Sequence, residues 1–141
     1  MANYCGFIRS NYFRVTDGNR FREIIADCSC EDRLDIFEDD AESNIFGFGC
    51  YGCIYGLREP GVEDSELSDD MDRFYAALQE VLHKDDAILI TEVGYEKLRY
   101  LIGYTIIITK DGIDAVDLRS EAFKKAGEML GVENYSTTDQ Y

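Results

Sequence analysis

The chain has 141 residues, 45% of them hydrophobic and eighteen of them phenylalanine or tyrosine, which predicts one packed domain and excludes global disorder. Its net charge of −15 opposes binding to nucleic acid or to anionic lipid. The sequence contains neither a run of about 18 apolar residues nor a leader with a basic start and an apolar block, so we expect a cytoplasmic protein.

The first half of the chain predicts three strands and one helix. Residues 11–15 (NYFRV) are aromatic and β-branched and predict a strand. Apolar positions at helical spacing up to Cys28 predict a helix capped by Asp17. Alternation at 33–38 predicts a second strand, and 45–55 (IFGFGCYGCIY) a third. Two glycines on one face of this third strand suit a close approach or a strong bend.

The second half predicts two helices around a meander of strands. An acidic connector at 56–67 holds the only proline, and Ser68 is the expected cap of the next helix. Ser120 is the expected cap of the last helix, which Gly131 should end. The expected strands between the two helices are 87–93, 97–109 and 113–118.

The order β-α-β-β-α-β-β-β-α predicts an α+β fold. Strands that follow one another at hairpin distance pair antiparallel. We therefore expect a mainly antiparallel sheet of about six strands with three helices on one face. Residues 1–133 should form a single domain, and 134–141 a flexible C-terminal tail.

The acid-rich segment, residues 31–72, carries fourteen acidic and two basic side chains, a net charge of −12 in 42 residues. Carboxylates on one face of a helix or strand fall about 5–7 Å apart, and this resembles the charge spacing of a nucleic-acid backbone. We expect the segment to bind a protein with a basic nucleic-acid-binding groove, with Tyr51, Tyr55 and Phe37 as apolar anchors. A solvated surface without a partner is the alternative. The expected partner-binding residues are Asp35, Glu38, Asp39, Asp40, Glu63, Asp64, Glu66, Asp69, Asp70 and Asp72.

Four of the five cysteines form two close pairs, Cys28 with Cys30 and Cys50 with Cys53. Such pairs suit a zinc site of four thiolates, although Cys50 and Cys53 would face opposite sides of a strand unless it bulges at the intervening glycine. Small buried hydrophobic side chains are the favoured interpretation, so we expect no cofactor. The single histidine, His83, has no nucleophile beside it in sequence, and we expect a protein that is not an enzyme.

Three stretches, NYFRVTD (11–17), FGFGCYG (46–52) and ITEVGYEKLRYLIGY (90–104), resemble small acidic proteins of bacterial phages and mobile elements. In size and charge the chain also resembles anti-restriction and anti-CRISPR inhibitors, a likeness that covers no aligned segment and transfers no site residues. It implies a non-enzymatic inhibitor of a nucleic-acid-handling host-defence protein that mimics nucleic-acid backbone charge.

Two further interpretations remain open. One is a regulatory or scaffolding module of a mobile element that uses the apolar 97–109 strand or the aromatic third strand as its interface, with the acids serving solubility. The other is a small zinc-binding protein that uses the clustered cysteines. In each case an exposed edge strand would permit a homodimer.

Overall fold

The protein is described by a computed structural model that covers residues 4–39, 43–58 and 69–137, without the side chains of Asp69 and Tyr100. Its helices are α1 (Gly18–Asp27), α2 (Met71–Val81) and α3 (Leu118–Leu130). Its strands are β1 (Cys5–Ser10), β2 (Phe13–Arg14), β3 (Cys28–Cys30), β4 (Leu34–Glu38), β5 (Ile45–Tyr51), β6 (Ile54–Arg58), β7 (Asp69–Asp70), β8 (Ile88–Glu96), β9 (Tyr100–Ile108) and β10 (Ile113–Asp117).

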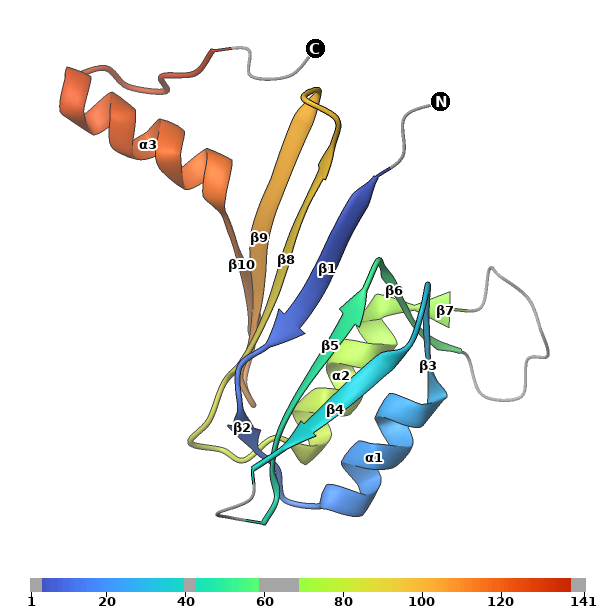
Figure 1. The fold of residues 1–141 in the computed structure, drawn as a ribbon. Coiled ribbons are helices and arrows are strands. Elements are labelled where there is room, and N and C mark those ends of the chain that lie inside the picture. Colours follow the sequence, from blue (N-terminus) through green and yellow to red (C-terminus); the bar gives the residue numbers. More distant parts are fainter. Residues whose placement is uncertain (1–3, 40–42, 59–68, 138–141) are drawn as a thin grey trace.

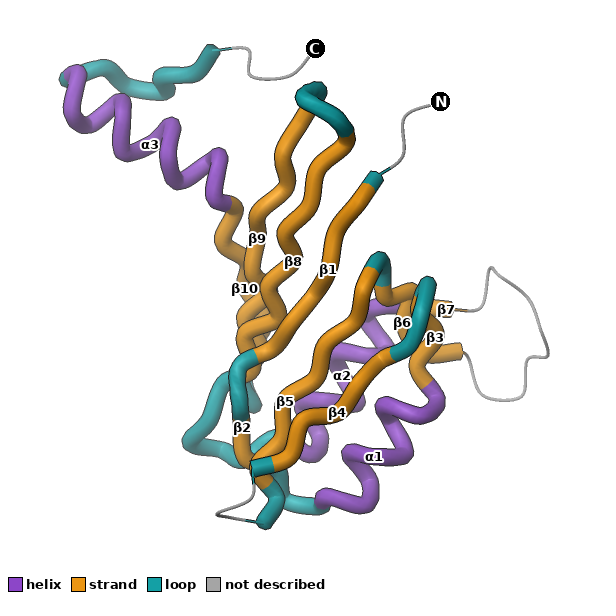
Figure 2. The backbone as a smooth tube through the Cα atoms, viewed as in Figure 1, coloured by secondary structure: helices purple, strands orange, loops and turns teal. Residues whose placement is uncertain are grey.

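The strands form one large and one small antiparallel sheet (Figures 1 and 2). The large sheet runs β10-β9-β8-β1-β5, with β2 and β4 also paired to β5. The small sheet runs β3-β6-β7. This confirms the predicted α+β class with a mainly antiparallel sheet.

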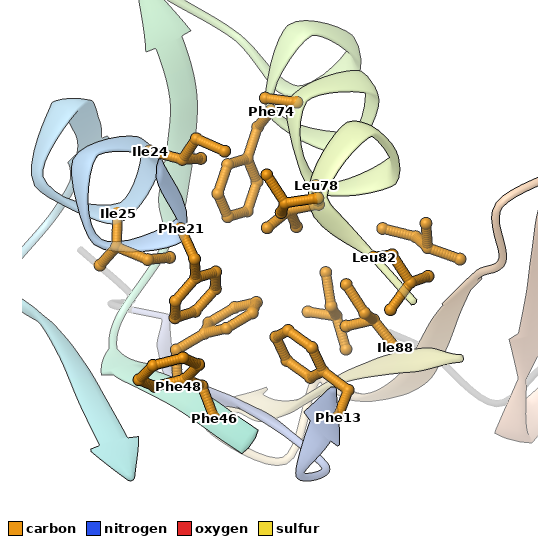
Figure 3. Close-up of a cluster of buried hydrophobic side chains, with 14 of the residues drawn as sticks. Phe13, Phe21, Ile24, Ile25, Phe46, Phe48, Phe74, Leu78, Leu82 and Ile88 are labelled. Carbon is orange, nitrogen blue, oxygen red and sulfur yellow. The ribbon is translucent and has the colours of Figure 1, made fainter. Parts of the chain in front are cut away.

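The core lies between the large sheet and helices α1 and α2, on what we call the inner face of the sheet. Rings from both layers pack edge to face or stacked, with Phe48 5.9 Å from Phe74 and Phe21 4.9 Å from Phe46 between centroids. Burial of such side chains is the main driving force for folding. The residues labelled in Figure 3 are Phe13, Phe21, Ile24, Ile25, Phe46, Phe48, Phe74, Leu78, Leu82 and Ile88.

The predicted strand at 45–55 is wrong, because the chain breaks at Gly52. This residue has a φ of +89°, which a residue with a side chain rarely adopts. The glycine directs β5 into the large sheet and β6 into the small one. The two glycines for which a close approach or a bend was predicted, Gly47 and Gly49, lie within β5, and the Phe37 ring approaches Gly49 closely. The break at Gly52 is a separate feature, and its consequence is two sheets rather than one long strand.

The predicted strand at 11–15 is also wrong in its bounds. Only Phe13–Arg14 pair with β5, while the main N-terminal strand is the unpredicted β1. The reason is Asn11, whose side chain donates to the Ala87 carbonyl at 3.0 Å and accepts from the Leu89 N–H at 2.8 Å. These side-chain bonds occupy backbone groups at the start of β8 and just before it, with which a continuing strand would pair.

Aspartate side chains cap all three helices. The Asp17 cap is confirmed, since its Oδ1 accepts from the Arg20 N–H at 3.1 Å. Asp70 caps α2, whereas Ser68 lies outside the described residues. Asp117 rather than Ser120 caps α3, and the Ser120 N–H donates to Asp117 Oδ1 at 3.0 Å. Helix α3 ends at Gly131, as expected, with a φ of +70°.

Helix α3 departs from the predicted layering of all helices on one face. Gly103 faces away from the core, and Leu118 in the first turn of α3 lies against it. The helix therefore begins on the outer face of the sheet and then projects beyond β10, away from α1 and α2 (Figure 1). After α3 the chain turns back along it, with the Tyr135 ring 6.2 Å from that of Phe123; 138–141 of the predicted tail lie outside the described residues.

Candidate interaction surface

An open groove of about 590 Å³ crosses the outer face of the large sheet. Its walls come from β1, the end of β5, β8, β9 and the start of α3. Cross-strand register places Phe7 opposite both Tyr51 and Val93, so aromatic and aliphatic side chains from three strands meet there. The lining residues are Cys5, Gly6, Phe7, Tyr51, Val93, Gly94, Tyr95, Leu101, Ile102 and Leu118.

The groove is apolar and open to solvent. Tyr51 is 72% exposed, Tyr95 51% and Phe7 49%. Successive side chains of a strand point to opposite faces of the sheet. The strand residues next to these three therefore face the inner side, while the three themselves line the groove. A contiguous exposed apolar patch of this kind is typical of a protein interaction site.

The groove lies beside part of the acid-rich segment. Strand β4 pairs with β5, and Leu34 stands opposite Cys50, next to Tyr51. The Glu31 carboxylate accepts from the Cys53 N–H at 3.0 Å, just after the Gly52 break. Glu31 and Asp32 are exposed there. The turn that follows Tyr51 therefore lies next to the exposed acid Glu31.

The predicted partner-binding acids do not form a single face in the described residues. Asp35 lies on the outer face and pairs with the Arg33 Nε at 2.9 Å, whereas Glu38 points to the inner side and pairs with Arg22 at 3.0 Å. The Asp70 carboxylate caps α2 by accepting from the Asp72 N–H. Asp39 follows β4, and Asp72 is exposed in the first turn of α2. Asp40, Glu63, Asp64, Glu66 and the side chain of Asp69 lie outside what the structure describes.

The predicted aromatic anchors differ in availability. Tyr51 and Tyr55 are exposed, but Phe37 is half-buried. The Arg9 guanidinium covers the Phe37 ring at 4.7 Å from its centroid, and the ring also lies against Gly49. Sequence reasoning missed Phe7 and Tyr95; the alternation of Cys5, Phe7 and Arg9 with Gly6 and Ile8 was the available signal.

The cysteines are thiols in different settings. Cys50 is buried in the core, and burial raises its pKa to about 11. Burial, together with the negative charges of Glu92 and Glu31, also raises the pKa of Cys53. A thiol that keeps its proton is a poor nucleophile. Among the described residues, no three His, Cys, Asp or Glu side chains gather closely enough to hold a metal ion.

A polar cluster lies on the inner face, above the core. The two oxygens of the Glu92 carboxylate accept from the Tyr4 hydroxyl at 2.6 Å and from the Tyr104 hydroxyl at 2.7 Å. The Tyr4 side chain lies against Gly6 and Gly94, where any Cβ would clash with it. Burial raises the pKa of both phenols, and the hydrogen bond to Glu92 and its negative charge raise it further. The cluster joins β8 and β9 to the N-terminal segment.

His83 has a structural role at the end of α2. Its ring Nδ1 accepts from the Asp85 backbone N–H at 3.1 Å, and the backbone N–H of His83 donates to the Arg14 carbonyl at 3.0 Å. These bonds fix the turn into β8.

Comparison with known proteins gives no matching family model, no similar curated protein and no similar solved structure. Among the described residues, no helix has the length and apolar character needed to cross a membrane.

Proposed function

We propose that the protein is a non-enzymatic inhibitor that binds a basic, nucleic-acid-handling protein in the cytoplasm. The groove on the outer face supplies apolar anchors, and the acid-rich segment at its border supplies charge. The observation that carries the proposal is the exposure of Tyr51 at the point where groove and acid-rich segment meet. Exposed tyrosine is a typical hot-spot residue because one rigid ring contributes both apolar area and a hydrogen-bonding group.

Charge complementarity identifies the chemistry of the partner. A segment with a net charge of −12 attracts a basic surface and accelerates the encounter. Charge alone is screened over about 8 Å at physiological ionic strength, so apolar anchors are needed for a lasting complex. The groove meets that need on the same face as Asp35 and close to Glu31. A protein that presents a basic nucleic-acid-binding groove fits both features.

The test is capture from bacterial lysate with wild-type protein and Tyr51→Ala, followed by competition. We expect a captured protein that added duplex DNA displaces, that raised salt releases, and that Tyr51→Ala binds at least tenfold more weakly. Tyr12→Ala is the matched control, because Tyr12 is 47% exposed but lies outside the groove. Asp32→Lys should weaken capture further in low salt.

Other outcomes overturn the proposal. A partner that Tyr51→Ala and Asp32→Lys bind like the wild type would exclude the groove and its border. A partner that requires Tyr51 but withstands both salt and DNA would instead support a regulatory or scaffolding module with an apolar interface. No captured protein at low salt would leave the acids as a solubility feature.

A further inference from the structure

The β10 edge of the large sheet is the starting point. In the described structure β10 pairs only with β9, and its five residues are all exposed. An unpaired strand edge carries backbone donors and acceptors that can pair with another chain. The edge also lies next to α3, which exposes Leu118, Met129 and Leu130 and buries only Gly127.

The hydrogen-bond pattern shows which backbone groups point outward. The Thr109 N–H donates to the Gly112 carbonyl and closes the β9–β10 turn. Bonded and non-bonded pairs alternate along an antiparallel ladder, so Asp114 and Val116 face β9, and Ile113 and Ala115 point their backbone groups outward. Independently, the Ala115 N–H donates to its neighbour's carboxylate, Asp114 Oδ1, at 2.8 Å, and so is not used by β9.

We propose that two copies of this chain pair antiparallel through their β10 edges, centred on Ala115. In this register Ala115 exchanges both of its backbone bonds with Ala115 of the second copy, and Ile113 stands opposite Asp117. Asp114 stands opposite Val116, so no two aspartates face each other directly. In the single copy the Ala115 N–H donates to the Asp114 carboxylate. In the pair it donates instead to the Ala115 carbonyl of the second copy.

The charge distribution permits this pairing in spite of the net charge of −15. Residues 113–130 carry four acidic and three basic side chains, a nearly balanced surface. Strand β4, in the acid-rich segment, lies five strand positions from β10, which is about 24 Å at the usual strand spacing. This exceeds the screening length of about 8 Å, so the acidic side chains of β4 in two copies barely repel each other across the interface.

Helix α3 adds area to the same interface. It spans 13 residues, about 20 Å, and projects beyond the β10 edge on the outer face (Figure 1). In the two-fold arrangement each α3 extends over the sheet of the other copy, towards the half-exposed outer-face side chains of Leu89 and Val116. A continuous sheet across both copies would then carry both aromatic grooves on one face.

The experiment measures self-association of the full chain by sedimentation velocity. We expect a concentration-dependent dimer that raised salt leaves unchanged or strengthens. Ala115→Pro removes only the outward donor and should raise the dimer dissociation constant roughly tenfold or more. Ala115→Val keeps the donor and is the matched control. Circular dichroism checks that both variants fold.

Hydrogen exchange on the wild type gives a second readout that needs no variant. The amides of Ile113 and Ala115 should exchange more slowly as protein concentration rises, while those of Asp114 and Val116 stay constant. A wild type that remains monomeric at its highest soluble concentration overturns the inference, as does a dimer that Ala115→Pro leaves intact. The inference is independent of the proposed function, because Ala115→Pro leaves the groove at Tyr51 unchanged.

Discussion

Helices α1 and α3 carry similar apolar side chains, but these are buried in α1 and not in α3. Helix α1 places Phe21, Ile24 and Ile25 in the core, whereas the only buried residue of α3 is Gly127. Both helices begin with an aspartate cap, but the apolar side chains of α3 are less segregated to one side than those of α1. What lies opposite differs as well: α1 faces the inner side of the sheet, and α3 leaves the sheet after its first turn. Amphipathic sequence thus specifies a helix but not whether its stripe is covered within one chain.

The largest contrast is expected from removing one aromatic ring in each region. Phe48 is fully buried among rings, so Phe48→Ala should lower the free energy of unfolding by about 3–5 kcal/mol. Phe123→Ala should lower it by less than about 1 kcal/mol, because that ring is only half-buried and meets Tyr135 alone among the aromatic rings of the described chain. Urea unfolding of dilute protein measures both. Equal losses would show that α3 belongs to the cooperative core.

The helix caps give a finer comparison. Asp70→Ala removes the cap of α2 and should cost about 1 kcal/mol of global stability. Asp117→Ala removes the equivalent cap of α3 and should leave the urea midpoint nearly unchanged while amide exchange within α3 accelerates. Native-state hydrogen exchange separates local from global opening. A lowered midpoint for Asp117→Ala would contradict the view that α3 opens by itself.

Alkaline pH should produce the smallest effect, through the Tyr4–Glu92–Tyr104 cluster. The pKa of both phenols is raised in the folded protein, so above the ordinary tyrosine value of about 10 the unfolded chain loses protons that the folded chain keeps. The stabilisation is complete below that pH and declines above it. In Tyr4→Phe/Tyr104→Phe the decline between about pH 9 and 11 should be shallower. An unchanged slope in the urea midpoints would show that the phenols do not contribute.

How far the sequence predicts this protein depends on whether a feature is local. The three helices were predicted well because their apolar spacing is carried by consecutive residues. Strand β1 was missed because it gains its stability from two neighbours far away in sequence, β5 and β8. The break at Gly52 could not be told from a bulge by composition alone.

The groove depends even more on strand order. Phe7, Tyr51 and Tyr95 come from three strands, and their proximity follows from the β8-β1-β5 arrangement. Sequence reasoning named Tyr51 because it lies in the acid-rich segment, and the structure shows that it is exposed. The dispersal of Asp35, Glu38 and Asp70 likewise follows from tertiary structure, since the first two alternate across β4 and the third caps a helix.

Cys5 is the one exposed cysteine of the five, and it lies in the groove beside Phe7. The unmodified chain therefore offers a chemical handle at the proposed binding surface, while Cys50 is buried and the other three thiols are partly shielded. A maleimide dye would label Cys5 first, and a bound protein would shield it from alkylation. The groove could thus be footprinted in the natural sequence, without a substitution that disturbs it.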